Sequence, residues 1–137
     1  MNEVFLDTSH AIALASPADK FHRQAITVVQ EINRMNARVV TTRAVMLEIG
    51  NAFASVQRRK AGLALLDSLE QDPHINILSM TEGLYSRAVT LYRNRPDKAW
   101  GLVDCVSFVV MQERRITDAL TSDLHFTQAG FRALLRD

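Results

Sequence analysis

Four acidic residues of this sequence stand beside apolar segments, where solvent is not their obvious partner. Two of them follow short apolar runs: Asp7 comes directly after Val4–Leu6, and Asp123 comes after Ala119–Thr121 with one serine between. A charged side chain is rarely buried unless it is paired or coordinated. These two positions therefore raise the question of what the carboxylates bind.

The other two acids lie inside helical patterns. Glu48 comes one turn after Val45 and four residues before Ala52, which places it on the apolar side of its predicted helix. Asp104 lies in the first turn of the pattern 102–113, the most apolar helical pattern in the chain. Both carboxylates are thus expected to face the interior rather than the solvent.

Each of the four acids also has a purely structural explanation. Asp7 could cap the helix that follows it, and Asp104 could complement a helix dipole from the first turn. Glu48 could pair with Arg43, and Asp123 could be an ordinary turn residue. The sequence leaves these alternatives open for each acid separately, whereas the joint placement of all four favours a shared site.

A site that gathers three carboxylates requires a counter-charge. At about 5 Å and an effective dielectric of about 20, each pair repels by roughly 3 kcal/mol, so a proton or a cation must reduce the repulsion. Oxygen ligands without a histidine or cysteine cluster suit Mg²⁺, with Mn²⁺ as a substitute, better than zinc. Such a site lowers the pKa of a bound water and stabilises charge on a phosphoryl oxygen, which is the chemistry of phosphodiester hydrolysis.

Other residues that could do chemistry show no comparable arrangement. The four histidines lack metal-ligand spacing, and Cys105 is expected to pack as a small apolar group. Asp118 begins its predicted strand, so it is expected at the opposite end of the sheet from Asp123. The basic clusters 58–60 and 93–98 are typical of solvated surface, and the second is the better candidate for contact with RNA.

The elements that must position the four acids alternate between strands and helices. Strands are predicted at 4–6, 38–42, 75–78, 119–121 and 131–135, and helices at 21–35, 45–56, 61–69, 81–92 and 102–113. Helical crossovers between strands predict a three-layer α/β/α sandwich with a mostly parallel central sheet of about five strands. Ligands bind at the carboxyl edge of such a sheet, where Asp7 and Asp123 are both expected.

Composition sets the remaining limits. The chain has 137 residues, 47% hydrophobic and 23% charged, so residues 1–137 are expected to form one domain with its own core. The single cysteine excludes an internal disulfide framework and favours a reducing, cytoplasmic location, and no apolar run is long enough to span a membrane. The net charge of +1 argues against a strongly basic nucleic-acid binder. Without the four acids above, however, the chain has 16 basic and 11 acidic residues, so the rest of the protein is moderately basic.

Four segments resemble those of the PIN-domain family, and specifically the VapC-type toxin ribonucleases. They are, in order, Val4–Ser9, Leu47–Asn51, Val103–Phe108 and Leu120–Phe126, and the resemblance covers the whole chain. It implies a PIN-like fold and an Mg²⁺-dependent endoribonuclease that hydrolyses RNA with a metal-activated water. Such a protein is usually the toxin of a toxin–antitoxin pair.

The resemblance also implies a role for each acid. Asp7 and Asp104 would be the principal Mg²⁺ ligands, and Asp123 would complete the metal site. Glu48 would bind the metal through water or orient the attacking water. These roles follow from the resemblance alone.

Further implications concern neighbouring hydroxyls and partners. Thr8 and Thr121 would hold the carboxylates and contact the phosphate of the RNA substrate. An antitoxin protein with a basic segment would plug the acidic cleft, and the toxin would be a homodimer. One departure from the family pattern is the segment Arg114–Ile116, where related sequences often turn with glycine.

Two other functions compete with this hypothesis. A phosphatase of the haloacid-dehalogenase type would use Asp7 as a nucleophile, but it needs Asp-x-Asp, whereas this chain has Asp-Thr-Ser at 7–9. A non-catalytic PIN-like module could bind RNA or a protein without cutting, but it would have no need of all four acids.

Overall fold

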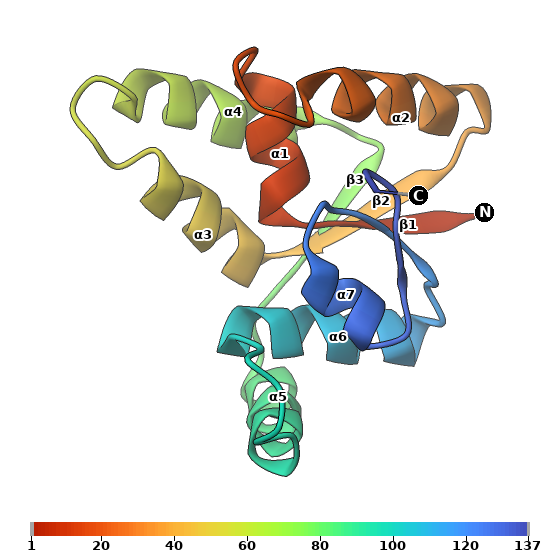
Figure 1. Cartoon of the computed structure of the whole chain (residues 1–137). Coiled ribbons are helices and arrows are strands. Elements are labelled where there is room, and N and C mark those ends of the chain that lie inside the picture. The colour runs from red at the N-terminus through yellow and green to blue at the C-terminus, as the bar shows by residue number, and fades with distance from the viewer. Residues whose placement is uncertain (1, 137) are drawn as a thin grey trace.

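Strands and helices alternate along the chain, and the strands assemble into one sheet (Figure 1). The computed structural model describes residues 2–136. The strands are β1 (Glu3–Leu6), β2 (Arg38–Thr42), β3 (Ile75–Leu78), β4 (Asp118–Leu120) and β5 (Arg132–Ala133). The helices are α1 (Thr8–Ala15), α2 (His22–Arg34), α3 (Arg43–Ala52), α4 (Arg59–Gln71), α5 (Glu82–Asn94), α6 (Leu102–Arg114) and α7 (Leu124–Gln128).

The sheet has the strand order β3-β2-β1-β4-β5, and every neighbouring pair is parallel. The predicted parallel sheet of about five strands is therefore confirmed. From β1 the chain first builds β2 and β3 on one side, and it later adds β4 and β5 on the other. The boundary between β1 and β4 is thus a switch point in the topology, and α/β proteins bind ligands at the carboxyl end of such a point.

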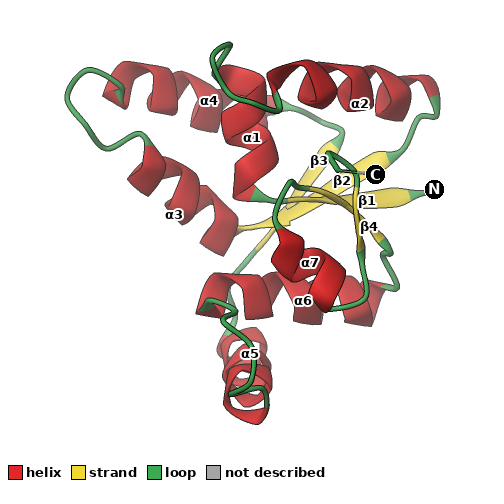
Figure 2. Ribbon diagram, in the orientation of Figure 1, coloured by secondary structure: helices red, strands yellow, loops and turns green. Residues whose placement is uncertain are grey.

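Helices cover both faces of the sheet, as the sandwich prediction requires. Figure 2 shows α1, α2 and α4 on one side of the strands and α5, α6 and α7 on the other. The seven consecutive residues Cys105–Met111 of α6 are all buried, because this helix lies against the sheet and carries α5 on its outer side. The apolar pattern of this segment therefore corresponds to a deeply buried helix.

A cluster of aromatic rings joins α6, α7 and β1 beneath the carboxyl edge of the sheet. The ring of Phe108 packs edge-to-face on Phe126 and on Trp100, with centroids 4.9 and 5.0 Å apart, and Phe126 in turn lies 6.4 Å from Phe5. Trp100 is 6% exposed and its indole N–H donates to the side-chain oxygen of Gln128 at 3.0 Å. These contacts hold the short helix α7 against α6, and they give Trp100 an anchoring role.

Several predicted boundaries differ from the observed ones. The helices α1 and α7 were not predicted: α1 is apolar on most sides and so lacks a clear amphipathic period, and α7 is only five residues long. The helix expected to reach Val56 ends at Ala52, and Val56 itself is 89% exposed. The last strand is limited to Arg132–Ala133 instead of 131–135.

The turn that follows α6 uses left-handed backbone without a glycine. Arg115 has a φ of 58° and a ψ of 40°, the conformation that glycine usually supplies at the end of a helix. The N–H of the next residue, Ile116, donates to the carbonyl oxygen of Met111 at 2.8 Å and closes the turn. Arg115 therefore adopts the left-handed conformation that a glycine would have at this turn, at a conformational cost of about 1 kcal/mol.

Within residues 2–136, no helix combines the length and the apolar character needed to cross a membrane.

Candidate active site

The carboxyl ends of β1 and β4 lie side by side, which brings the first and last segments of the site together. The backbone N–H of Asp7 donates to the carbonyl oxygen of Leu120 at 3.1 Å and extends the pairing of the two strands by one residue. Asp7 and Thr121 therefore begin their loops at the same point of the sheet edge. The sequence prediction that these strand ends share an edge is confirmed.

Asp7 is buried and held by two hydroxyl groups. The residue is 5% exposed, and its Oδ2 accepts hydrogen bonds from Thr121 Oγ1 at 2.8 Å and from Ser9 Oγ at 3.1 Å. Burial raises the pKa of the carboxyl to about 6, since desolvation of the charged form outweighs the hydrogen bond from Thr121, and the negative charge of Asp104 adds to the rise. Asp7 thus retains a proton to a higher pH than a surface aspartate does.

Thr121 connects Asp7 with Asp123. Its hydroxyl donates to Asp7 and accepts the backbone N–H of Asp123 at 3.0 Å. Asp123 then caps α7, because its Oδ1 accepts the N–H of His125 at 2.9 Å. The side chain of Thr121 is fully buried, so its hydroxyl positions the two aspartates.

Asp104 completes the cluster from the start of α6. Its Oδ2 accepts the backbone N–H of Gly101 at 3.1 Å and lies 3.0 Å from Nδ1 of His125. The same ring nitrogen lies 3.4 Å from Oδ1 of Asp123. Burial raises the pKa of Asp104, and its hydrogen bonds with Gly101 and His125 oppose the rise. An unbroken series of contacts therefore joins the site residues in the order Asp7, Thr121, Asp123, His125 and Asp104.

Glu48 approaches the cluster from α3. Its Oε1 accepts a hydrogen bond from Thr8 Oγ1 at 2.8 Å, which ties the helix to the first residue of α1. Burial raises the pKa of Glu48 and the hydrogen bond from Thr8 opposes the rise, while the charges of Asp104 and Asp123 reinforce it. Glu48 therefore lies within the electrostatic reach of the other acids.

The contacts of the four acids show which of their purely structural explanations hold. Arg43 forms its ion pair with Glu70, so the proposed pairing of Arg43 with Glu48 is wrong. Asp7 stands at the cap position of α1 but makes no capping hydrogen bond with its side chain. The carboxylates at the starts of α6 and α7 do bond to backbone N–H groups of their helix ends. Asp104 and Asp123 therefore both stabilise the start of a helix and belong to the acidic cluster.

Three residues are placed to hold a cation together. One possible ligand atom from each of Asp104, Asp123 and His125 lies within 4.8 Å of the others. Asp7 is outside this group of three and is joined to it through Thr121. Two carboxylates and an imidazole fit a divalent ion. A site with a nitrogen ligand favours Mn²⁺ over Mg²⁺ more than a site with oxygen ligands alone does.

His125 was absent from the expected ligands. Its partners are carboxylates, and one of them lies on another helix, so no histidine or cysteine cluster in the sequence indicates this site. The available signal was the spacing Asp123-x-His125 at the start of a helix, but α7 is too short to produce a recognisable helical period. The structure therefore adds His125 to the side chains that could contribute to a cation site.

The residues set aside for other reasons lie as expected. Asp118 begins β4, at the end of that strand opposite to Thr121, and its carboxylate lies 3.7 Å from Nε of Arg132. Cys105 is a buried free cysteine within α6. Neither side chain is part of the group of possible ligands described above.

Comparison with known proteins identifies the family. The model of the PIN domain matches residues 4–132, whereas no curated protein sequence matches significantly. Among solved structures, Mycobacterium tuberculosis VapC20, a sarcin–ricin loop cleaving toxin, has a TM-score of 0.81 at 23% identity, covering 93% of this chain and 95% of its own. Rickettsia felis VapBC2, bound to a promoter DNA fragment, has a TM-score of 0.70 at 11% identity, covering 96% of each chain.

A third structure, FitAcB of Neisseria gonorrhoeae, has a TM-score of 0.65 at 18% identity, covering 95% of this chain and 94% of its own. These identities are low, so the three structures establish a shared fold. The family model, in contrast, spans nearly the whole chain, including all four acids and His125. The chain therefore belongs to the PIN domain family.

Proposed function

We propose that this protein is a divalent-metal-dependent endoribonuclease and the toxin of a toxin–antitoxin pair. The observation that carries the proposal is the series of contacts that gathers Asp7, Asp123 and Asp104 at the switch point of the sheet. The similarity to VapC20, which is described as a toxin that cleaves the sarcin–ricin loop, supports RNA as the substrate.

In this proposal, Asp104, Asp123 and His125 hold the cation, and Asp7 adjoins it. A divalent cation there would offset the negative charge of the site, stabilise charge on a phosphoryl oxygen and lower the pKa of the attacking water. Both hydroxyl donors to Asp7 lie on Oδ2, so Oδ1 is the oxygen we assign to the cation side. Mg²⁺ and Mn²⁺ both fit this donor set.

We assign Glu48 to the attacking water. The hydrogen bond from Thr8 leaves the second carboxylate oxygen, Oε2, without a protein donor within residues 2–136. Because its pKa is raised, Glu48 is a better proton acceptor than a surface glutamate. Thr8, which is half-buried, positions Glu48 and is assigned the contact with the phosphate, whereas the fully buried Thr121 only positions the aspartates.

Cleavage of a fluorescently labelled single-stranded RNA tests the proposal. With Mg²⁺ or Mn²⁺ present, the wild-type protein should cut the RNA, and EDTA should abolish the cut. Asp104→Asn is expected to lower the rate at least about 100-fold, because it removes a charged ligand from the cation. Asp118→Asn is the matched control, since it removes the same charge from the other end of β4.

The outcomes separate the proposal from its alternatives. Full activity in a well-folded Asp104→Asn protein would exclude the assigned metal site. RNA binding without any cleavage, in all metals tried, would favour a non-catalytic module. A phosphatase of the Asp-nucleophile type is disfavoured because Ser9, in place of a second aspartate, donates its hydroxyl to Asp7.

We also propose an antitoxin partner and a homodimer. The similarity to the VapBC2 and FitAcB structures supports an antitoxin, which would be encoded in a neighbouring reading frame. Leu47 on α3 and Leu63 on α4 are 70% and 55% exposed, and such apolar side chains are suited to a subunit interface. Sedimentation of the isolated protein and co-purification with the neighbouring gene product test the two partners separately.

A further inference from the structure

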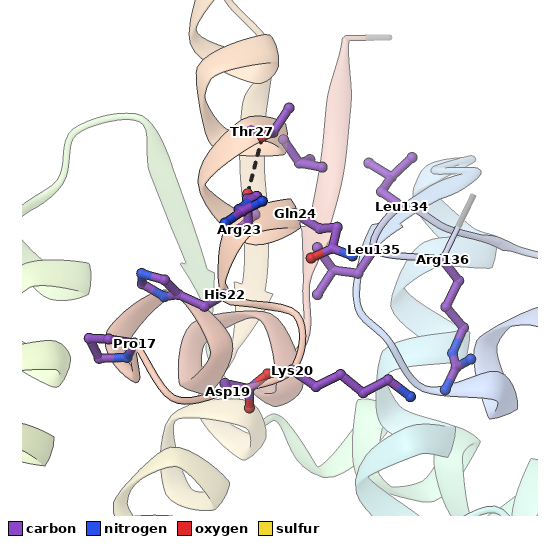
Figure 3. A pocket seen from close by; sticks show the side chains of 11 residues that line it. Pro17, Asp19, Lys20, His22, Arg23, Gln24, Thr27, Leu134, Leu135 and Arg136 are labelled. Atoms are coloured by element: carbon purple, nitrogen blue, oxygen red, sulfur yellow. Dashed lines mark hydrogen bonds between the residues drawn. The ribbon is translucent and has the colours of Figure 1, made fainter.

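An open, basic pocket lies between the loop that joins α1 to α2 and the C-terminal segment that follows β5. Its volume is about 860 Å³, and its lining residues come from 17–28 and 134–136. Figure 3 shows the side chains that surround it. Lys20, Arg23 and Arg136 are cationic, His22 is a further basic group, and Asp19 is the one acid among the lining residues.

Two of these cations pack on one aromatic ring. The Nζ of Lys20 and the Cζ of Arg136 each lie 5.3 Å from the centroid of the Phe21 ring. Asp19 fixes the loop by accepting the N–H of Phe21 at 2.8 Å. Figure 3 shows the ends of the Lys20 and Arg136 side chains converging. Two positive charges that lie over the same ring create a local potential that attracts an anion.

The pocket borders the carboxylate site. Arg136 donates from Nε to the carbonyl oxygen of Ser122, the residue between Thr121 and Asp123. The N–H of Ser122 donates to Ser9 Oγ at 3.1 Å, and that hydroxyl donates to Asp7 at 3.1 Å. A series of hydrogen bonds thus connects Arg136 with the carboxylate of Asp7 at the sheet edge.

We propose that Lys20 and Arg136 bind a backbone phosphate of the RNA adjacent to the phosphate that is cut. This inference rests on the proposed function, because it takes the substrate to be RNA. The hydrogen bonds from Asp7 through Ser9 and Ser122 to Arg136 support this placement, because they put the pocket next to the carboxylate site. Phosphate contacts position a nucleic acid without reading its sequence, so this subsite acts on every RNA sequence alike.

The test removes both charges and measures RNA binding over a range of salt concentrations. Fluorescence anisotropy with a labelled single-stranded RNA in EDTA, where cleavage is suppressed, gives the Kd of the wild type and of Lys20→Gln/Arg136→Gln. We expect the Kd of the double variant to rise about tenfold. The slope of log K against log salt is expected to become less negative by about 0.7, since the two cations bind one phosphate and each neutralised phosphate of a single strand contributes about 0.7. In cleavage assays with metal, KM is expected to rise more than kcat falls.

Two control variants separate charge from structure. Lys20→Arg/Arg136→Lys keeps both charges and is expected to bind RNA within about twofold of the wild type. Arg38→Gln/Lys60→Gln removes the same net charge from the start of β2 and the first turn of α4, and is expected to leave the salt slope unchanged. Thermal unfolding checks the fold, and the single exposed Lys20→Gln replaces the double variant if that protein is unfolded.

The two proposals fail in different ways. If the wild type cuts RNA and the double variant binds with the Kd and salt slope of the control, the subsite is wrong and the nuclease stands. If the wild type binds RNA with the predicted dependence on both cations but cuts none, the nuclease is wrong and the phosphate subsite stands. If the double variant binds RNA as the wild type does but binds an acidic protein partner more weakly, the pocket is a protein-binding site and the phosphate subsite is wrong.

Discussion

Replacement of Asp7 by asparagine is expected to stabilise the metal-free protein at neutral pH while it removes the activity. Burial raises the pKa of this carboxyl from 3.8 to about 6, so above that pH the folded protein holds a buried charge. Asparagine removes the charge and keeps an oxygen that can accept the hydroxyls of Thr121 and Ser9. The carboxylate that the proposed reaction requires therefore lowers the stability of the metal-free protein.

The expected size follows from proton linkage. The pKa of Asp7 is higher in the folded state than in the unfolded state, so the folded protein binds more protons between pH 3.8 and about 6. The free energy of unfolding therefore falls as the pH rises through this window and is lowest above it. A separation of about two pKa units corresponds to roughly 3 kcal/mol. For a chain of 137 residues this is about 10 °C in Tm.

Thermal unfolding in EDTA from pH 4 to 8 measures this contribution. The difference in Tm between Asp7→Asn and the wild type should widen as the pH rises from 4 through 6 and level off above about 7. Taking the difference cancels most of the effect of Glu48 and Asp104, whose raised pKa values act in the same direction in both proteins. Asp67→Asn, an exposed carboxyl on α4, serves as the control and should follow the wild type.

A Tm difference that does not change between pH 4 and 8 would refute this reasoning. Destabilisation by Asp7→Asn at pH 7 would do the same, because it would mean that the buried charge costs less than the hydrogen bonds disturbed by the amide. Added Mg²⁺ or Mn²⁺ should raise the Tm of the wild type and narrow the difference, since a bound cation compensates the charge.

Three further substitutions test the supports of the site. His125→Asn is expected to weaken Mn²⁺ binding more than Mg²⁺ binding in calorimetry, because imidazole suits transition metals better; equal losses would mean that His125 only positions Asp104. Thr121→Val is expected to lower the free energy of unfolding by about 1–3 kcal/mol and to raise the pKa of Asp7 further, which a shift of the pH–rate profile to higher pH would show. Gly62→Ala is expected to lower the free energy of unfolding in urea by about 1–3 kcal/mol, although alanine has the better helix propensity. The reason is that the new Cβ would lie 2.5 Å from Cβ of Phe53. A stabilised variant would contradict the packing between α3 and α4.

Local patterns predicted the elements that are long or strongly periodic. The predicted strand 38–42 is β2, and the apolar run after Leu102 is the buried helix α6. These features depend on neighbours within one or two helical turns, so the residues themselves carry the information. The short helix α7 escaped because five residues are too few to show a period.

The sequence by itself determined which acids stand at the ends of strands or on apolar helix faces, because those placements depend on local hydrophobic order. It could not determine which strands become neighbours. Asp7 and Thr121 are separated by 114 positions and share a hydrogen bond only because β4 pairs with β1. Periodicity shows that a face is buried, but the packing of whole layers decides what covers it.

For the same reason, only the tertiary structure decided the partner of each carboxylate. Glu48 faces Thr8 while the nearby Arg43 turns to Glu70 on another helix. His125 joins Asp104 because the aromatic contacts of Phe126 and Phe108 press α7 onto α6. The sequence supplied the acids and their places along the chain, and the packing of the layers supplied the distances on which their chemistry depends.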